Sequence, residues 1–124
     1  VCHVMDFMAT FLDAAGAAYP ESYNGHEITP MEGESLVPLF EGSDWERARP
    51  LFWEHEGNRA VRDGWWKLVR RYPGEWELYD MVRDRTELQD LSGANSPRAE
   101  AMESRYRAWA ARVGVRAWPL VGRG

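Results

Sequence analysis

Four short runs rich in aromatic and β-branched residues constrain the fold of this chain more than any other feature. Turn signals separate the runs, so the expected strands are 50–54, 58–62, 65–71 and 75–79. Asp63-Gly64 is a strong two-residue hairpin signal, because both of its positions favour positive φ. Pro73-Gly74 provides another turn. The simplest product is a four-stranded antiparallel meander.

The segment before these strands predicts a helix over residues 3–15. Its apolar residues recur at spacings of three and four, as they do on one broad helix face. They include Val4, Met5, Phe7, Met8, Phe11 and Leu12. Gly16 follows at the position where a helix often ends in a left-handed conformation.

A region rich in proline and glycine, residues 19–33, is expected to form a long irregular connection. Long loops in compact domains need a reason, and a second domain against which the loop lies would provide one. Residues 34–40 favour a short helix that ends at Gly42.

The region after the strands predicts a long helix with Ser96 as N-cap and Pro97 as its first residue. Proline is favoured at this position because its missing N–H would have no helical partner. The apolar stripe of this helix steps by four, three and four through Met102, Tyr106, Trp109 and Val113. Gly114 ends it. A helix with one such stripe should lie across one face of the meander, which gives an α+β fold.

Composition excludes several classes of protein. The 124 residues fit one domain, and the net charge of -5 gives no reason to expect binding to nucleic acid. No apolar run approaches the length of a membrane span. Cys2 is the single cysteine, so no disulfide can form within the chain and the cellular compartment stays undetermined. Seven tryptophans predict an aromatic core or a surface that packs against another domain.

The sequence predicts no metal site and no catalytic residue in this chain. His55-Glu56 lacks the second histidine of a zinc-protease helix, because position 59 is arginine. Cys2 is interpreted as a small buried thiol rather than a nucleophile. The acidic residues from Asp80 to Asp90 lack the ligand spacing of a calcium loop, so we interpret them as solvated turn residues.

The polar side chains between the first two expected strands are the candidate site. Arg59 can bind an oxyanion in a bidentate way, and Asn58 and His55 can donate hydrogen bonds. With Glu56, these residues make the turn a candidate site for an anionic ligand. The alternative is a hydrogen-bonded turn with an internal pair between Glu54 and Arg59.

Several segments in order resemble the C-terminal subdomain of a type I sulfatase. Residues 3–16 resemble the family's D-x-x-x-T-x-L-x-x-x-G helix, and residues 33–42 resemble G-x-S-L-x-P-L-L-x-G. Residues 62–68, R-D-G-W-W-K-L, are similar to its strand region. Residues 76–91 resemble W-x-L-Y-D-x-x-x-D-x-x-E-x-x-D-L. The order of these segments across some ninety residues makes the resemblance specific.

The resemblance implies hydrolysis of sulfate esters within the alkaline-phosphatase-like superfamily. The family's nucleophile lies in C/S-x-P-S/A-R and is converted to formylglycine, and calcium assists it. No such motif occurs in this sequence, and Cys2 lies in C-H-V-M-D. We therefore expect the nucleophile and the calcium ligands to belong to a catalytic domain upstream of Val1, and this chain to be inactive alone.

The resemblance also implies a division of the chain. Residues 1–33 are expected to be the C-terminal edge of the catalytic α/β domain, and residues 34–124 the small subdomain that packs against it. The expected partner is thus the catalytic domain of the same polypeptide. In that enzyme, the turn with His55, Glu56, Asn58 and Arg59 is expected to approach the rim of the substrate cleft. Without that neighbour, we expect homo-oligomerisation through the apolar face of the first helix.

Two alternative functions stay open. One is a free-standing binding or interaction domain that uses its aromatic sheet for a partner. The other is a fragment of a related phosphodiesterase or phosphonate hydrolase, which a different upstream nucleophile motif would identify.

Overall fold

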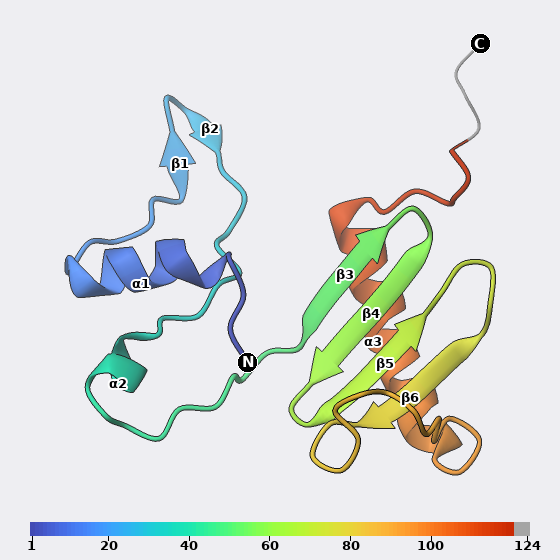
Figure 1. Ribbon diagram of the computed structural model, residues 1–124. Coiled ribbons are helices and arrows are strands. Elements are labelled where there is room, and N and C mark those ends of the chain that lie inside the picture. The colour runs from blue at the N-terminus through green and yellow to red at the C-terminus, as the bar shows by residue number, and fades with distance from the viewer. Residues whose placement is uncertain (121–124) are drawn as a thin grey trace. The chain divides into compact units, whose positions relative to one another are not determined.

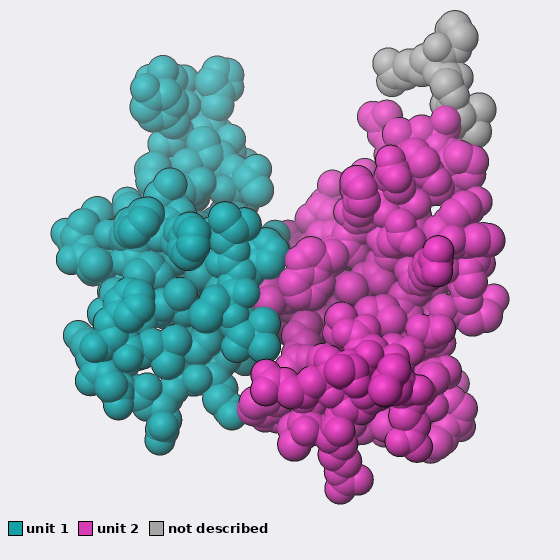
Figure 2. Space-filling view, in the orientation of Figure 1, with its two compact units in different colours: residues 1–48 teal, residues 49–124 magenta. Residues whose placement is uncertain are grey.

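The computed structural model describes residues 1–120 and divides the chain into two compact units, residues 1–48 and 49–124 (Figures 1 and 2). The predicted boundary lies earlier, after Gly33. The assignment of the preceding residues to a catalytic domain stays a prediction. In the described part of the chain, no helix has the length and apolarity needed to cross a membrane.

Helix α1 (Asp6–Ala14) confirms the predicted N-terminal helix but starts later than expected. The carboxylate of Asp6 accepts the backbone N–H of His3 at 2.7 Å, which holds the residues before the helix in a turn. This helix is oriented unexpectedly in the first unit, because its apolar side chains point outward. Its buried residues are Asp6, Ala9 and Thr10.

A small hairpin of β1 (Ser22–Tyr23) and β2 (His26–Glu27) follows α1. Asn24 and Gly25 form its turn with φ of 50° and 79°. Asn-Gly is the preferred dipeptide for such turns, because both positions tolerate positive φ. The prediction of an irregular connection is therefore wrong at these residues.

Helix α2 (Val37–Phe40) is shorter than the predicted helix over residues 34–40. The N–H groups of Glu34 and Leu36 instead donate to side chains of α1, which keeps this segment out of a helix. Gly42 follows with φ of 77°, as the sequence predicts for a residue that ends a helix.

The second unit contains the predicted meander. Its strands pair antiparallel in sequence order and are β3 (Leu51–His55), β4 (Asn58–Asp63), β5 (Trp66–Arg70) and β6 (Trp76–Asp80). A turn lies between β5 and β6, but one residue earlier than Pro73-Gly74: the N–H of Gly74 donates to the carbonyl of Arg71 at 2.6 Å, so its central residues are Tyr72 and Pro73.

The hairpin turn between β4 and β5 lies one residue later than predicted. Asp63 pairs with Trp66, so the turn consists of Gly64, with φ of 55°, and Trp65. A turn at Asp63-Gly64 would place Val61 opposite Trp66. The observed register places Val61 opposite Leu68 instead and so aligns the aliphatic side chains that form the core.

Helix α3 (Ser96–Val113) lies across one face of the sheet and packs against β4, β5 and β6 (Figure 1). Its N-cap is Asn95 rather than the predicted Ser96, because the carbonyl of Asn95 already accepts the N–H groups of Arg98 and Ala99. Gly114 ends the helix in the left-handed conformation, with φ of 74°.

The core between helix and sheet contains three strand residues and two helix residues. They are Val61, Leu68, Leu78, Met102 and Tyr106, each at most 2% exposed. Aromatic rings surround this core, and Phe52 stacks on Trp109 with 5.3 Å between ring centroids. The predicted α+β architecture, a meander with a helix on one face, is confirmed.

Candidate functional site

The turn between β3 and β4 contains the residues that the sequence singles out. Glu56 and Gly57 form it with φ of 51° and 81°. A Cβ atom at Gly57 would lie 2.9 Å from the ring of Tyr72 and 3.1 Å from Cβ of Trp118, so a larger residue does not fit. The N–H of Gly57 donates to Oε1 of Glu54 at 2.9 Å. The turn is therefore a fixed part of the fold.

The four residues predicted to border a cleft do not form one cluster. His55 and Asn58 are cross-strand partners and share the sheet face opposite α3. Arg59, one residue on, belongs to the other face, where its guanidinium lies 5.5 Å from the ring centroid of Tyr106. Glu56 is at the tip of the turn. A single oxyanion site would need Arg59 on the same face as His55.

Two hydrogen bonds hold the side chain of Asn58 against the backbone. Its Nδ2 donates to the carbonyl of His55 at 2.9 Å, and its Oδ1 accepts the N–H of Tyr72 at 3.1 Å. The side chain thus connects the turn with the end of β5. His55, Glu56 and Asn58 are all exposed, but the hydrogen bonds of Asn58 leave His55 and Glu56 as the side chains of this turn that are better placed for a ligand.

Beneath α3, several polar atoms are buried without a hydrogen-bond partner among the described residues. They are Nε of Arg59, Nε1 of Trp76 and the hydroxyl of Tyr106. The ring of Trp76 meets that of Tyr106 edge-on at 5.4 Å. Burial raises the pKa of Tyr106, although the positive charge of Arg59 opposes this effect. In the sequence, Tyr106 is only one residue of an apolar stripe, and no pattern indicates this polar cluster.

The D-x-x-x-T motif forms the centre of the first unit. Asp6 is fully buried, and its carboxylate accepts the N–H of Glu34 at 3.0 Å and a charged hydrogen bond from Arg47. Burial alone would raise the pKa of Asp6, but these hydrogen bonds outweigh it and lower the pKa. Thr10 accepts the N–H of Leu36 at 3.0 Å. The motif therefore joins α1 to the segment before α2.

Gly33 opens the second motif and fits closely beneath α1. A Cβ atom there would lie 2.1 Å from the carbonyl oxygen of Met5, a distance that no side chain can occupy. This contact explains why the G-x-S-L segment needs glycine at its first position.

The acidic residues after β6 fold the loop that contains them. Asp84 accepts the N–H groups of Leu88 and Gln89, each at 2.8 Å, and the Gln89 bond contributes most to lowering the pKa of Asp84. Asp90 accepts the N–H of Leu78 at 2.9 Å and so fixes the loop to β6. These carboxylates are turn residues, as predicted.

The sheet face opposite α3 combines aromatic and charged side chains. Trp53 is 37% exposed, and Lys67 forms an ion pair with Glu87. Tyr79 is buried and donates its hydroxyl to Glu77, and burial together with this bond raises the pKa of Tyr79 to about 12. Such a mixed face is suited to contact with another protein surface.

The cysteine and the acidic groups of the described residues bear on the predictions for reactive and metal-binding groups. Cys2 is exposed, so its interpretation as a buried thiol is wrong. Among residues 1–120, no group of three His, Cys, Asp or Glu side chains is placed to hold a metal ion. The calcium site that the resemblance implies is expected in a domain upstream of Val1 and stays a prediction.

Several known proteins are similar to this chain in sequence or in fold. The chain is 33% identical over 99 residues to an N-acetylglucosamine-6-O-sulfatase of Bacteroides thetaiotaomicron, and the match covers 72% of the chain but 17% of that protein. The crystal structure of Ps i-CgsB in complex with k-i-k-neocarrahexaose matches with a TM-score of 0.67, at 23% identity, over 85% of this chain and 23% of that one. The phosphonate monoester hydrolase of Agrobacterium radiobacter matches with a TM-score of 0.57, at 22% identity, over 86% and 24%.

The two structural likenesses show a shared fold. The family match reaches further, because it covers residues 1–108 and so includes α1, both motifs of the first unit, the meander and most of α3. The chain belongs to the family of sulfatase C-terminal domains described as N-sulphoglucosamine sulphohydrolase, C-terminal.

Proposed function

We infer that this chain is the C-terminal part of a sulfuric ester hydrolase that acts on sulfated amino sugars, and that it supports the catalytic domain of that enzyme. The matched sulfatase relative, named for N-acetylglucosamine 6-O-sulfate, supports the choice of substrate. The chain spans 17% of that relative, so the rest of such a protein would supply the nucleophile. Formylglycine and calcium are part of this proposal and belong to that upstream domain.

The outward apolar face of α1 carries the proposal. Its side chains Phe7, Met8 and Phe11, together with Val4 just before the helix, are 53–69% exposed. They occupy one side of the helix, and Phe7 and Phe11 lie 6.4 Å apart between ring centroids. The opposite side buries Asp6 and Thr10, so rotation of the helix cannot hide the apolar residues without breaking the motif. A continuous apolar face of this kind needs a partner surface.

The catalytic domain is the partner that best accounts for this face. A second copy of the chain could also cover it, as the oligomer prediction requires. The sulfatase relative, however, contains several times more polypeptide than the matched region, and we expect the corresponding polypeptide of this protein to be joined to the helix by the chain. Tethering gives a high effective concentration, so intramolecular packing outcompetes association of two copies.

The test compares variants of the longer protein that contains this chain. The double substitution of Phe7→Asp and Phe11→Asp places two charges in the apolar interface, so it should separate the two surfaces and abolish hydrolysis of N-acetylglucosamine 6-sulfate. Leu88→Asp is the control, because Leu88 is an exposed apolar residue of the acidic loop, and it should leave hydrolysis intact. Residues 1–124 alone should show no turnover of an aryl sulfate. An active double variant, or turnover by residues 1–124 alone, would contradict the proposal.

A phosphonate hydrolase with this fold is the alternative to a sulfatase, and the hydrolysis assay distinguishes the two. A parent enzyme that hydrolyses a phosphonate monoester and leaves the sulfated sugar intact would replace the sulfatase proposal. A free-standing interaction domain would be indicated if residues 1–124 form a stable dimer through α1 and no longer polypeptide contains them.

A further inference from the structure

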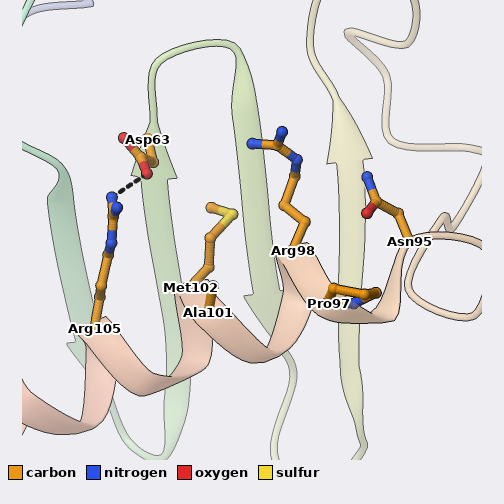
Figure 3. A pocket seen from close by; sticks show the side chains of 7 residues that line it. All are labelled: Asp63, Asn95, Pro97, Arg98, Ala101, Met102 and Arg105. Atoms are coloured by element: carbon orange, nitrogen blue, oxygen red, sulfur yellow. Dashed lines mark hydrogen bonds and ion pairs between the residues drawn. The ribbon is translucent and has the colours of Figure 1, made fainter.

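A groove beside the first turns of α3 belongs to none of the features described so far. It has a volume of about 360 Å³ and lies between the helix and the β4–β5 end of the sheet (Figure 3). Its polar lining residues are Asp63, Asn95, Arg98 and Arg105, and Pro97 and Met102 form part of its apolar surface. The volume is at the small end of the range for ligand pockets and is suited to a single sugar unit.

The groove has an excess of positive charge in a chain whose net charge is -5. Arg105 forms an ion pair with Asp63, so these two charges offset each other. Arg98 has no carboxylate partner within the described part of the chain. Its charge is available for an anion.

Arg98 is also held in a defined position. Its guanidinium lies 4.6 Å from the ring centroid of Trp66, in a cation–π contact. This contact places the guanidinium beside the indole ring, and a guanidinium has five N–H donors with which to bind an oxyanion. Figure 3 shows the side chains of Arg98 and Asn95 projecting from the start of α3 on the same side of the helix.

The remaining polar groups suit hydroxyl groups next to that anion. The amide of Asn95 can both donate and accept hydrogen bonds, and the carboxylate of Asp63 can accept one from a hydroxyl. The apolar surface at Pro97 and Met102 suits the C–H face of a pyranose ring. An anionic group flanked by hydroxyls on a small ring is the chemistry of a sulfated or carboxylated sugar.

We propose that this groove binds an anionic sugar unit, with its sulfate or carboxylate group on Arg98 and its hydroxyls near Asn95 and Asp63. The choice of a sulfated sugar as probe rests on the proposed function. The expectation that the groove binds an anion rests only on the charge and shape of the groove. Binding is measured without hydrolysis, so a failure here leaves the sulfatase proposal standing, and the reverse also holds.

The experiment titrates residues 1–124 with N-acetylglucosamine 6-sulfate and follows the backbone amide signals by NMR. Signals of Asp63, Asn95 and Arg98 should shift and saturate. Arg98→Gln should weaken binding by roughly tenfold or more, as expected for the loss of a charge-assisted hydrogen bond. Arg107→Gln is the matched control, because Arg107 is on the same helix, pairs with Glu103 and does not line the groove. The control should bind like the wild type.

Separate ligands distinguish the sources of the anion. Glucuronate should also bind, and uncharged N-acetylglucosamine should bind much more weakly. The proposal is overturned if no groove signal shifts, if Arg98→Gln binds as tightly as the wild type while its spectrum shows a folded protein, or if inorganic sulfate binds as tightly as the sulfated sugar. Asn95→Ala provides a second variant that weakens binding of the sugar without changing that of sulfate.

Discussion

Replacing Asp6 by asparagine tests the central claim about the first unit, that a buried carboxylate holds α1 to the segment before α2. Oδ2 of Asp6 accepts the N–H of His3 at 2.7 Å and the charged hydrogen bond from Arg47, and Oδ1 accepts the N–H of Glu34. An asparagine keeps one acceptor but turns the other atom into a donor. Whichever way the amide lies, that donor faces another donor: the N–H of Glu34 on one side, or those of His3 and Arg47 on the other.

The expected loss of stability depends on the charge partner that Arg47 still has after the substitution. Its side chain is 8% exposed, and after the substitution its remaining acidic neighbour is Glu34 at 3.7 Å. Removing one partner of a buried ion pair costs about 3–5 kcal/mol. Because Glu34 still compensates part of the charge, we expect the lower end, about 3 kcal/mol, which corresponds to a roughly hundredfold change in an equilibrium constant.

Hydrogen exchange measures this loss locally. The amides of Glu34 and Leu36, which donate to Asp6 and Thr10, should exchange roughly a hundredfold faster in Asp6→Asn at neutral pH. Asp13→Asn is the control, because Asp13 is exposed and bonds to Ser35, and it should change exchange by much less. Exchange of both amides within twofold of the wild type in Asp6→Asn would refute the claim.

The same carboxylate predicts a pH dependence with a defined sign. The pKa of Asp6 in the folded protein is below its ordinary value of 3.8. Its stabilisation is therefore complete above about 3.8 and is lost as the pH falls through the lower folded pKa. Wild-type protection of the Glu34 amide should decline over that acidic range, and Asp6→Asn should lack this step.

Two further predictions concern the second unit. Tyr106→Phe removes a buried hydroxyl without a partner among the described residues, so it should leave the free energy of unfolding unchanged or raise it by about 1 kcal/mol in a urea titration; a clear loss of stability would show that the hydroxyl is hydrogen-bonded. His55→Ala in the full-length enzyme should lower kcat/KM for the sulfated sugar if the β3–β4 turn borders the cleft. Asn58→Ala should instead lower the melting temperature, because Asn58 bonds to Tyr72; unchanged kcat/KM in His55→Ala would remove the turn from the site.

The meander could be predicted because its signals are local. Strand period, aromatic content and two-residue turns all act over a few residues, and all four strands were found. The one-residue error at Gly64 arose because turn preference alone does not include the gain from aligning Val61 with Leu68. The hairpin at Asn24-Gly25 was predictable from the same turn chemistry and was missed because proline and glycine nearby suggested a loop.

Other features depend on tertiary contacts and left no pattern in the sequence. The apolar period of α1 correctly predicted a helix, but period alone cannot show which side faces inward, and here buried Asp6 and Thr10 determine it. The separation of Arg59 from His55 is different, because strand alternation already implies it. The residue types suggested one site that includes both side chains. The two-residue turn pairs His55 with Asn58, however, and so places Arg59 on the other face of the sheet.

The residues that carry the family resemblance are mostly occupied by the fold itself. Asp6, Thr10, Asp84 and Asp90 accept backbone N–H groups, and Gly33 allows a close backbone approach. Side chains used in this way are not free to bind a substrate, so the resemblance identifies the fold and, through it, the enzyme family. Contacts made by this chain in a longer sulfatase must come from groups that the fold leaves unused. Three places contain such unused groups: the exposed face of α1, the tip of the β3–β4 turn and the groove at Arg98. Substitutions at these places should affect function more than folding.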